Sequence, residues 1–270
     1  MARNPRDLRA RFGNEALALL APLLARAPSD PELHYLAGEA WIAVAEERVP
    51  AHLDAQAAAR AHEELDAVGR LDPEGARAED TAVERGLLYM RQGRFADALD
   101  EYRRALVLHA VAGPYPVGLG LVEHHGGTGA LIHENMAEAL MGLGRLDESI
   151  AHYHRALEMS PGDRRLSSLP LWGLAVALDR DEQLDKARAA IKQALARDPQ
   201  MADLDDRDVF FVPEGEKLYY QALGYIERDM PEAAESVLQL YLKTNPRPRF
   251  LGRARARLAD VVSRLAAPQK

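Results

Sequence analysis

The stretch GRLDESIAHYHRALEMSP, residues 144–161, decides how the rest of the chain is interpreted. Small residues, large apolar residues and a final proline follow one another at fixed offsets, at Gly144, Leu146, Ser149, Tyr153, Ala156, Leu157 and Pro161. Steps of three and four residues place these side chains on one face of a helix, and the proline marks its end. A single helix cannot bury such a face alone, so the pattern predicts packing against a neighbouring helix.

The same signature recurs elsewhere in the chain. LDKARAAIKQALARDP at 184–199 repeats the small residue, the Ala-Leu pair and the proline. GRFADALDEYRRALVLHA at 93–110 has Ala110 in place of the proline, and PEAAESVLQLYLKTNP at 231–246 has Pro231 at the aromatic position. Repetition of one helical signature along a chain indicates stacked helical hairpins, each of which buries its apolar face on the next.

These copies resemble the tetratricopeptide repeat, a helical hairpin of about 34 residues. The resemblance implies an all-α fold, a right-handed α-solenoid of such hairpins with a C-terminal capping helix, in one domain over residues 1–270. We expect a partial repeat at 14–30, a stretched repeat at 31–75, full repeats at 79–112, 130–163, 168–201 and 215–248, and the capping helix at 249–267. In the repeat at 79–112, Arg85 replaces the leucine that is usual in the family.

Insertions interrupt the repeats. The segment 113–129 is rich in glycine and proline, and the segment 202–214 is acidic and contains the pair Phe210-Phe211. Insertions of this length are usually functional or covered by a partner. A third insertion, around residues 46–56, is expected to lengthen the helices of the stretched repeat. Near the C-terminus, Arg249, Arg253 and Arg257 form one charged stripe, expected to solubilise the capping helix or to meet an acidic partner or a phosphate.

The resemblance implies that the first helix of each hairpin lines a concave groove. The residues expected to bind a partner there are Trp41, Val83, Leu87, Met90, Glu134, Glu138, Met141, Trp172, Val176, Tyr219, Leu223 and Ile226, joined by Phe210 and Phe211 of the insertion. Most are apolar or aromatic, and an apolar strip on a surface usually marks a binding site. The alternative is that the strip is core, covered by the chain's own insertions.

One branch of the family binds a C-terminal carboxylate through Lys, Asn and Arg on the first helices. In this chain only Asn135 fits that clamp, while Glu134 and Glu138 would repel a carboxylate. We therefore expect a ligand of apolar and basic character.

Histidines gather in one part of the chain, at His109, His124, His125, His133, His152 and His154, with Glu134 among them. Their spacing lacks the His-Glu-x-x-His pattern of a zinc enzyme, and the chain has no cysteine. We expect neither a metal site nor catalysis, and no cofactor. A formal net charge of −8 argues against nucleic-acid binding, which requires a positive surface. No apolar stretch is long enough to span a bilayer, and we expect a cytoplasmic protein of bacterial type.

The leading functional hypothesis is a non-enzymatic adaptor whose groove binds another protein or a peptide. A second hypothesis is a structural subunit that self-assembles through the groove and the terminal helix into a homo-oligomer. A third, less favoured, is a metal-dependent enzyme built on the histidine-rich region 124–154.

Overall fold

The structure is a computed structural model that describes residues 5–46, 53–112, 129–159, 164–205, 210–212, 214–244 and 249–266, without the side chains of 5–11, 112, 164–167, 205 and 214. These residues form twelve α-helices and a short 3₁₀ helix, η1. In chain order they are α1 (Pro5–Arg26), α2 (Pro31–Ala45), α3 (Ala55–Leu71), α4 (Ala78–Arg91), α5 (Phe95–Ala112), α6 (Gly129–Gly142), α7 (Leu146–Met159), α8 (Arg164–Arg180), α9 (Leu184–Arg197), η1 (Ala202–Asp205), α10 (Glu214–Glu227), α11 (Pro231–Thr244) and α12 (Leu251–Ala266). Within the described ranges, none of the helices combines the length and the apolarity that a bilayer crossing requires.

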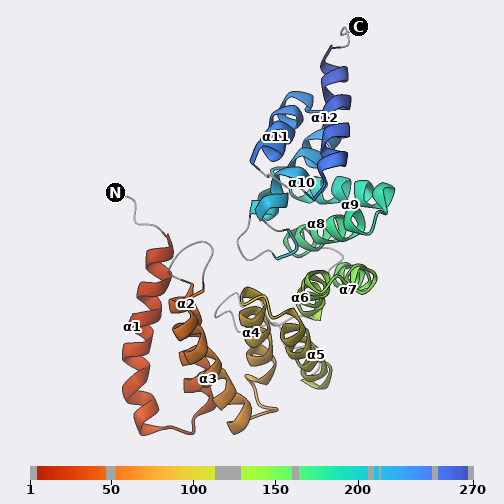
Figure 1. Cartoon of the computed structure of the whole chain (residues 1–270). Helices are drawn as coiled ribbons and strands as arrows, with labels where there is room; N and C mark the ends of the chain where they lie inside the picture. The colour runs from red at the N-terminus through yellow and green to blue at the C-terminus, as the bar shows by residue number, and fades with distance from the viewer. Residues whose placement is uncertain are drawn as a thin grey trace. The chain divides into compact units, whose positions relative to one another are not determined.

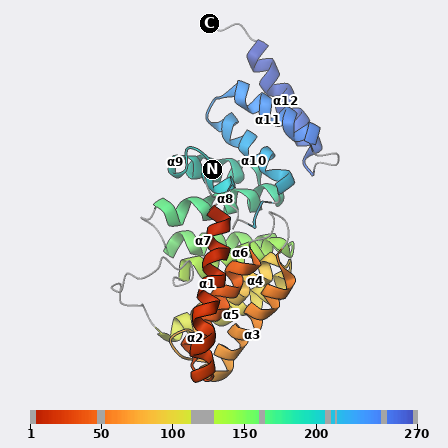
Figure 2. The ribbon, with the colours of Figure 1, turned by 90° about the vertical axis from the view of Figure 1, so that its left-hand side faces the viewer.

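The chain divides into two compact units, Met1–Met136 and Ala137–Lys270. In the first unit, α2 lies beside α1 and α3, and α4 pairs with α5 (Figure 1). In the second unit, α8 pairs with α9, α10 pairs with α11, and α12 follows alongside α11 (Figure 2). Helices that are neighbours in sequence are thus neighbours in space, as the internal repetition predicted.

Four hairpins turn in the same way, through a residue with a left-handed backbone two positions before the second helix. Gly93 and Gly144 have φ of 70° and 74°, and Glu182 and Asp229 have φ of 61° and 56°. The next residue donates its backbone N–H back to the first helix, as Gln183 does to the Leu178 carbonyl at 2.9 Å. This bond satisfies a carbonyl that the helix end leaves unpaired.

Small residues let the helices approach closely. A Cβ built on Gly173 of α8 would lie 2.3 Å from Cζ of Tyr153, and one on Gly86 of α4 would lie 2.3 Å from Cε1 of Tyr102. Both tyrosine rings are fully buried. Ser149 takes the position that alanine holds in other copies, and its hydroxyl donates to the Ala137 carbonyl at 2.8 Å. The hydroxyl is therefore buried with its hydrogen bond made.

The insertion around residues 46–56 separates two helices and does not extend α2. Helix α2 ends at Ala45, and α3 begins after Asp54, whose carboxylate accepts the backbone N–H groups of Gln56 and Ala57 at 3.0 Å each. An aspartate at this position is a strong helix start signal. The expected lengthening is thus not found at the α2 end, while residues 47–52 lie outside the described ranges.

Arg85, the departure from the family pattern, is held by two carboxylates. Its Nη1 lies 3.0 Å from Asp66 of α3 and its Nη2 lies 2.9 Å from Glu101 of α5. Arg85 and Glu101 are largely buried, so the pair replaces an apolar contact by a charged one between three helices.

Candidate partner-binding site

Trp172, in the middle of α8, belongs to an extensive buried cluster in the second unit. Its side chain is fully buried, and its Nε1–H donates to Oδ2 of Asp198 at 3.2 Å. Asp198 follows the end of α9, and its carboxylate also accepts the backbone N–H groups of Ala202 and Asp203 at 3.0 and 3.1 Å. One carboxylate thus holds the indole, the end of α9 and the start of η1 together.

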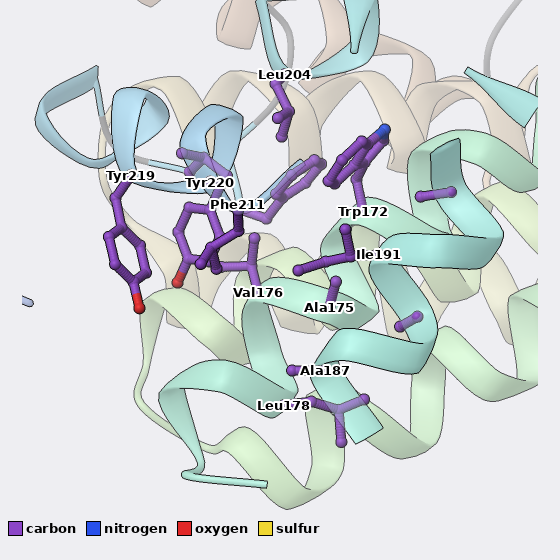
Figure 3. Close-up of a cluster of buried hydrophobic side chains, with 14 of the residues drawn as sticks. Trp172, Ala175, Val176, Leu178, Ala187, Ile191, Leu204, Phe211, Tyr219 and Tyr220 are labelled. Carbon is purple, nitrogen blue, oxygen red and sulfur yellow. The ribbon is translucent and has the colours of Figure 1, made fainter. Parts of the chain in front are cut away.

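Residues of the acidic insertion cover the first-helix side chains of α8 and α10. Leu204, Phe211 and Val212 of the insertion are buried, and so is Met201 directly before it. Figure 3 shows the Phe211 ring among Val176, Tyr220 and Trp172, with Leu204 beside the indole. We refer to the apolar side chains beneath these residues, namely Trp172, Val176, Tyr219, Tyr220 and Leu223, as the covered face.

The backbone of the insertion also contacts the protein. The backbone N–H of Phe210 donates to Oε2 of Glu138 on α6 at 3.3 Å, across 72 residues of sequence. Glu138 is itself buried. The three described residues 210–212 therefore lie on this unit much as a short bound peptide would, with apolar side chains and one backbone hydrogen bond as contacts.

The other end of the covered face is closed by Phe250 and by the start of the helix that follows it, α12. Phe250 stacks on Tyr219 with ring centroids 4.5 Å apart, and Arg253 lies over the Phe250 ring. Burial raises the pKa of Tyr219 to about 12, with a smaller contribution from Asp179, so its hydroxyl stays protonated. A hollow of about 30 Å³ remains beside Leu223 and Ile226.

The structure buries most of the residues predicted to bind a partner. The buried ones are Val83, Met90, Glu134, Glu138, Met141, Trp172, Val176, Tyr219, Leu223 and Phe211. Trp41, Leu87, Phe210 and Ile226 are half-buried. In the second unit the physical reason is the insertion and α12, which cover the strip that the periodicity placed on the first helices.

Trp41 lies at an open hollow in the first unit. The hollow has a volume of about 510 Å³ and is lined by Asn14, Trp41, Val44, Asp54, Gln56, Ala57, Arg60 and Glu64. Beside it, both ring nitrogens of His34 face acceptors, with Nδ1 2.6 Å from Glu64 and Nε2 3.0 Å from the Pro28 carbonyl. Two acceptors favour the doubly protonated, charged imidazole. In this hollow the Trp41 indole lies near charged side chains of both signs, Arg60 and Glu64. Such a lining suits a peptide side chain with an apolar stem and a polar end.

The first helix also presents apolar side chains to solvent. Among the described side chains of α1, Phe12 is 62% exposed, Leu19 is 72% exposed and Leu23 is 44% exposed. Spacings of seven and four residues place them on one stripe. Apolar side chains that gather on an exposed surface often mark an interaction site, so this stripe is a second candidate contact surface.

The histidine-rich region gives no ligand cluster in the part of the chain that is described. Among those residues, three or more His, Asp or Glu side chains nowhere converge as metal ligands would. His109 lies 3.0 Å from Glu79, and His133 is buried on α6. His124 and His125, with the rest of insertion 113–128, lie outside the described residues.

Sequence periodicity missed several residues of this site. Leu204 and Val212 belong to an insertion and Met201 directly precedes it, so no repeat offset predicts their burial. The available signal was the apolar run Val209-Phe210-Phe211-Val212 inside an acidic segment. Tyr220 was missed because it is adjacent to Tyr219 on α10, and both rings are buried in the same cluster.

Comparison with known families and structures supports the repeat pattern. Two tetratricopeptide repeat models match the chain, one at residues 130–200 and the other at residues 80–109. A search of curated proteins finds no significant match. The family and the all-helical fold predicted from the sequence are thereby confirmed.

Solved structures share the fold at low sequence identity. BtubC from P. vanneervenii is 16% identical, with a TM-score of 0.57 and coverage of 99% of this chain and 95% of that chain. PilF of Pseudomonas aeruginosa is 12% identical, with a TM-score of 0.54 and coverage of 93% and 96%. YrrB, a TPR protein with an unusual peptide-binding site, is 14% identical, with a TM-score of 0.51 and coverage of 88% and 97%.

Proposed function

Because this chain belongs to the tetratricopeptide repeat family, we propose that it is a non-enzymatic adaptor that binds another protein or a peptide. Proteins of this family generally mediate protein–protein or peptide binding and are typically non-catalytic. Each unit offers a candidate binding surface made by first-helix side chains: Trp41 and Leu87 in the first unit, and Ile226 and the covered face in the second.

The observation that carries this proposal is the seating of residues 210–212. This short irregular piece of chain lies against Val176 and Trp172 and donates a backbone hydrogen bond to Glu138. A surface that accepts one such segment has the apolar burial and the acceptor that a segment of another protein requires. The peptide-binding site in the name of YrrB adds analogy to this argument.

The test is selection of peptides from a random display library on the immobilised full-length chain. Selected peptides are labelled, and their dissociation constants are measured by fluorescence polarisation. We expect Trp41→Ala or Ile226→Glu to weaken binding by about tenfold or more, as loss of an interface anchor does. The matched control is Leu240→Glu on α11, a second-helix residue that is 45% exposed. Failure of every peptide to bind, or equal weakening by the control, contradicts the proposal.

A second candidate function is a subunit of a homo-oligomer, favoured by the exposed stripe of Phe12, Leu19 and Leu23 on α1. Apolar side chains exposed together on a terminal helix lose contact with water when another helix packs on them. Light scattering across a dilution series distinguishes this candidate. A mass that falls on dilution, and falls to the monomer in Leu19→Glu, supports it; a monomer at every concentration contradicts it.

A further inference from the structure

Two helix faces of this chain, one on α1 and one on α12, match each other in the size and charge of their side chains. We propose that α12 of one copy packs antiparallel on α1 of a second copy, so that copies associate head to tail. The proposed contact rests on the second candidate function, the homo-oligomer, and adds to it the surface that covers the stripe on α1.

The face on α1 carries large apolar side chains, Phe12 and Leu19 of the exposed stripe. The side of α1 that packs on α2 is a different one. It holds Gly13, where an added Cβ would lie 2.8 Å from the Ala40 carbonyl oxygen, and Leu20, which is buried. A helix from another molecule can therefore cover the stripe while α2 keeps its place, and burial of the apolar side chains favours association.

The face on α12 carries small residues. A Cβ built on Gly252 meets nothing within 4 Å, so the space beside it is open. The opposite side of the helix packs on the protein, since Ala254 and Val261 are fully buried. Exposed small residues recur at steps of four, three and four positions along one stripe: Gly252, Ala256, Ala259 and Ser263. Such residues let a second helix approach closely and leave room for its large side chains.

The two stripes fit together in one antiparallel register. Phe12 and Leu19 are seven residues apart, and the same spacing separates Gly252 from Ala259. When the two helices run antiparallel, Phe12 can lie over Ala259. In that register Leu19 lies over Gly252, so both large side chains meet small residues. Two helices joined by a short turn within one hairpin pack antiparallel in the same way.

The charges beside the stripes agree with this register. Glu15 on α1 and Arg255 on α12 are both exposed. Each follows the first residue of its stripe by three positions, which places it about 60° to the same side of that stripe. In the antiparallel pair these positions share one edge, and Glu15 lies nearly level with Arg255. The opposite charges attract there and favour this register over others.

Pairing of α1 with α1 of a second copy lacks this complementarity. In the register that sets Phe12 of one copy over Leu19 of the other, large side chains meet large ones. Glu15 then lies nearly level with Glu15 of the other copy on the same edge, and like charges repel. The α12 face is therefore the better cover. Because it differs from the α1 face, the contact is heterologous, and copies can add one after another.

Light scattering of the full-length chain across a dilution series tests the proposal. One helix from each copy makes a small interface, so the series runs from about 1 µM to about 1 mM. We expect the mean mass to rise with concentration and to pass that of a dimer. Leu19→Glu on α1 and Ala259→Glu on α12 should each stay monomeric. The matched control, Leu240→Glu at an exposed position of α11, should associate like the wild type.

A mixture of the two variants distinguishes head-to-tail association from other kinds. Leu19→Glu keeps its α12 face and Ala259→Glu keeps its α1 face, so an equimolar mixture should form a dimer that grows no further. Formation of this dimer also shows that both variants are folded, because each supplies its intact face. A mixture that stays monomeric while the wild type associates overturns the proposal.

Exchange of the two charges tests the register. Glu15→Arg and Arg255→Glu should each weaken association of the full-length chain by about threefold or more at low salt, because like charges then share one edge. The double variant restores opposite charges and should recover most of the loss. A double variant as weak as the two single variants together overturns the register, and the proposal with it.

The same measurements separate the α12 contact from the homo-oligomer itself. If Ala259→Glu associates like the wild type while Leu19→Glu stays monomeric, the homo-oligomer stands and the α12 contact alone is wrong. If the wild type is a monomer at every concentration, both fail. Neither result bears on the adaptor function, which the peptide selection tests.

Discussion

Arg253 of α12 contacts Asp179 at the end of α8, 74 residues earlier in the chain: Nη1 lies 2.9 Å from Oδ1 and 3.1 Å from the Asp179 carbonyl. Tyr220 donates its hydroxyl to the other carboxylate oxygen at 3.3 Å. Asp179 is 3% exposed, so this carboxylate is buried with a charged partner and a hydrogen bond. Arg253 therefore fastens the terminal helix, and it is not simply one member of an exposed arginine stripe.

Loss of this cation should destabilise the second unit. Arg253→Gln leaves a buried carboxylate without its charged partner, and we expect a loss of about 2–4 kcal/mol in the free energy of unfolding. The matched control is Arg255→Gln on the exposed side of α12, expected within about 0.5 kcal/mol of the wild type. Urea unfolding followed by circular dichroism measures both, and equal effects of the two variants would contradict the argument.

The stability deficit of Arg253→Gln should depend on pH. Burial raises the pKa of Asp179 even though Arg253 and Tyr220 act in the opposite direction. Without Arg253 the carboxyl takes up a proton more readily, which removes the uncompensated charge. The difference in unfolding free energy between wild type and variant should be largest near pH 8 and shrink as the pH falls towards 5. A difference that does not change over this range would show that charge is not its origin.

His34 and His62 should respond to pH in opposite directions. Burial alone lowers the pKa of His34, but bonds to the Pro28 carbonyl and to Glu64 outweigh it and raise that pKa above 6.5. His34 thus stabilises the fold below about pH 6.5 and loses this contribution as the pH rises. Burial lowers the pKa of His62, so its contribution is lost as the pH falls. Relative to wild type, His34→Gln should lose more stability at pH 6 than at pH 8.5, and His62→Gln the reverse. If both variants lost more stability at the same pH, the opposite directions assigned to the pKa values of His34 and His62 would be wrong.

Glu182→Gly should stabilise the α8–α9 hairpin. Glu182 has φ of 61°, a conformation that is costly for a residue with a Cβ, and its side chain is 85% exposed. Glycine removes that strain but adds entropy to the unfolded chain, for a net gain of about 0.5–1 kcal/mol. Glu182→Ala keeps the Cβ and should bring no gain. Thermal unfolding of the two variants separates backbone strain from loss of the glutamate charge.

Gly173→Ala should destabilise the packing of α8 on α7. The added methyl group would lie 2.3 Å from Cζ of Tyr153, a buried ring with no room to move, so we expect a loss of about 1–3 kcal/mol. Gly252 of α12 is the control, since a Cβ there meets nothing within 4 Å. Gly252→Ala should be neutral or gain up to about 1 kcal/mol through helix propensity. If Gly173→Ala were as stable as the wild type, the prediction would be wrong, and α7 and α8 would be able to move apart at little cost.

The sequence was sufficient to predict the helices and their pairing, because both depend on local periodicity. Helix α9 begins at Leu184, the first residue of the repeated stretch at 184–199. The repeat signature also predicts the turn glycines, Gly93 and Gly144, and the buried tyrosines, Tyr102 and Tyr153, because they recur at the same offsets in two copies. Each of these features is fixed by residues within one hairpin.

Long-range contacts could not be predicted in this way. Periodicity placed Trp172 and Val176 on the first-helix strip, but the side chains that cover them come from an insertion with no repeat offset. The contact of Arg253 with Asp179 spans 74 residues and depends on where α12 packs. The partners of Arg85 lie on helices before and after it, so the substitution is explained only once α3, α4 and α5 are packed together.

The left-handed turn that four hairpins share limits how the chain can be lengthened or shortened during evolution. Four hairpins reverse direction through the same backbone conformation although the turning residue is Gly93, Gly144, Glu182 or Asp229. The second helix therefore leaves each turn in the same orientation, whichever residue makes it. Genetic duplication or deletion of a whole hairpin conserves that geometry, while loss of part of one does not. The gene can therefore grow or shrink by whole hairpins.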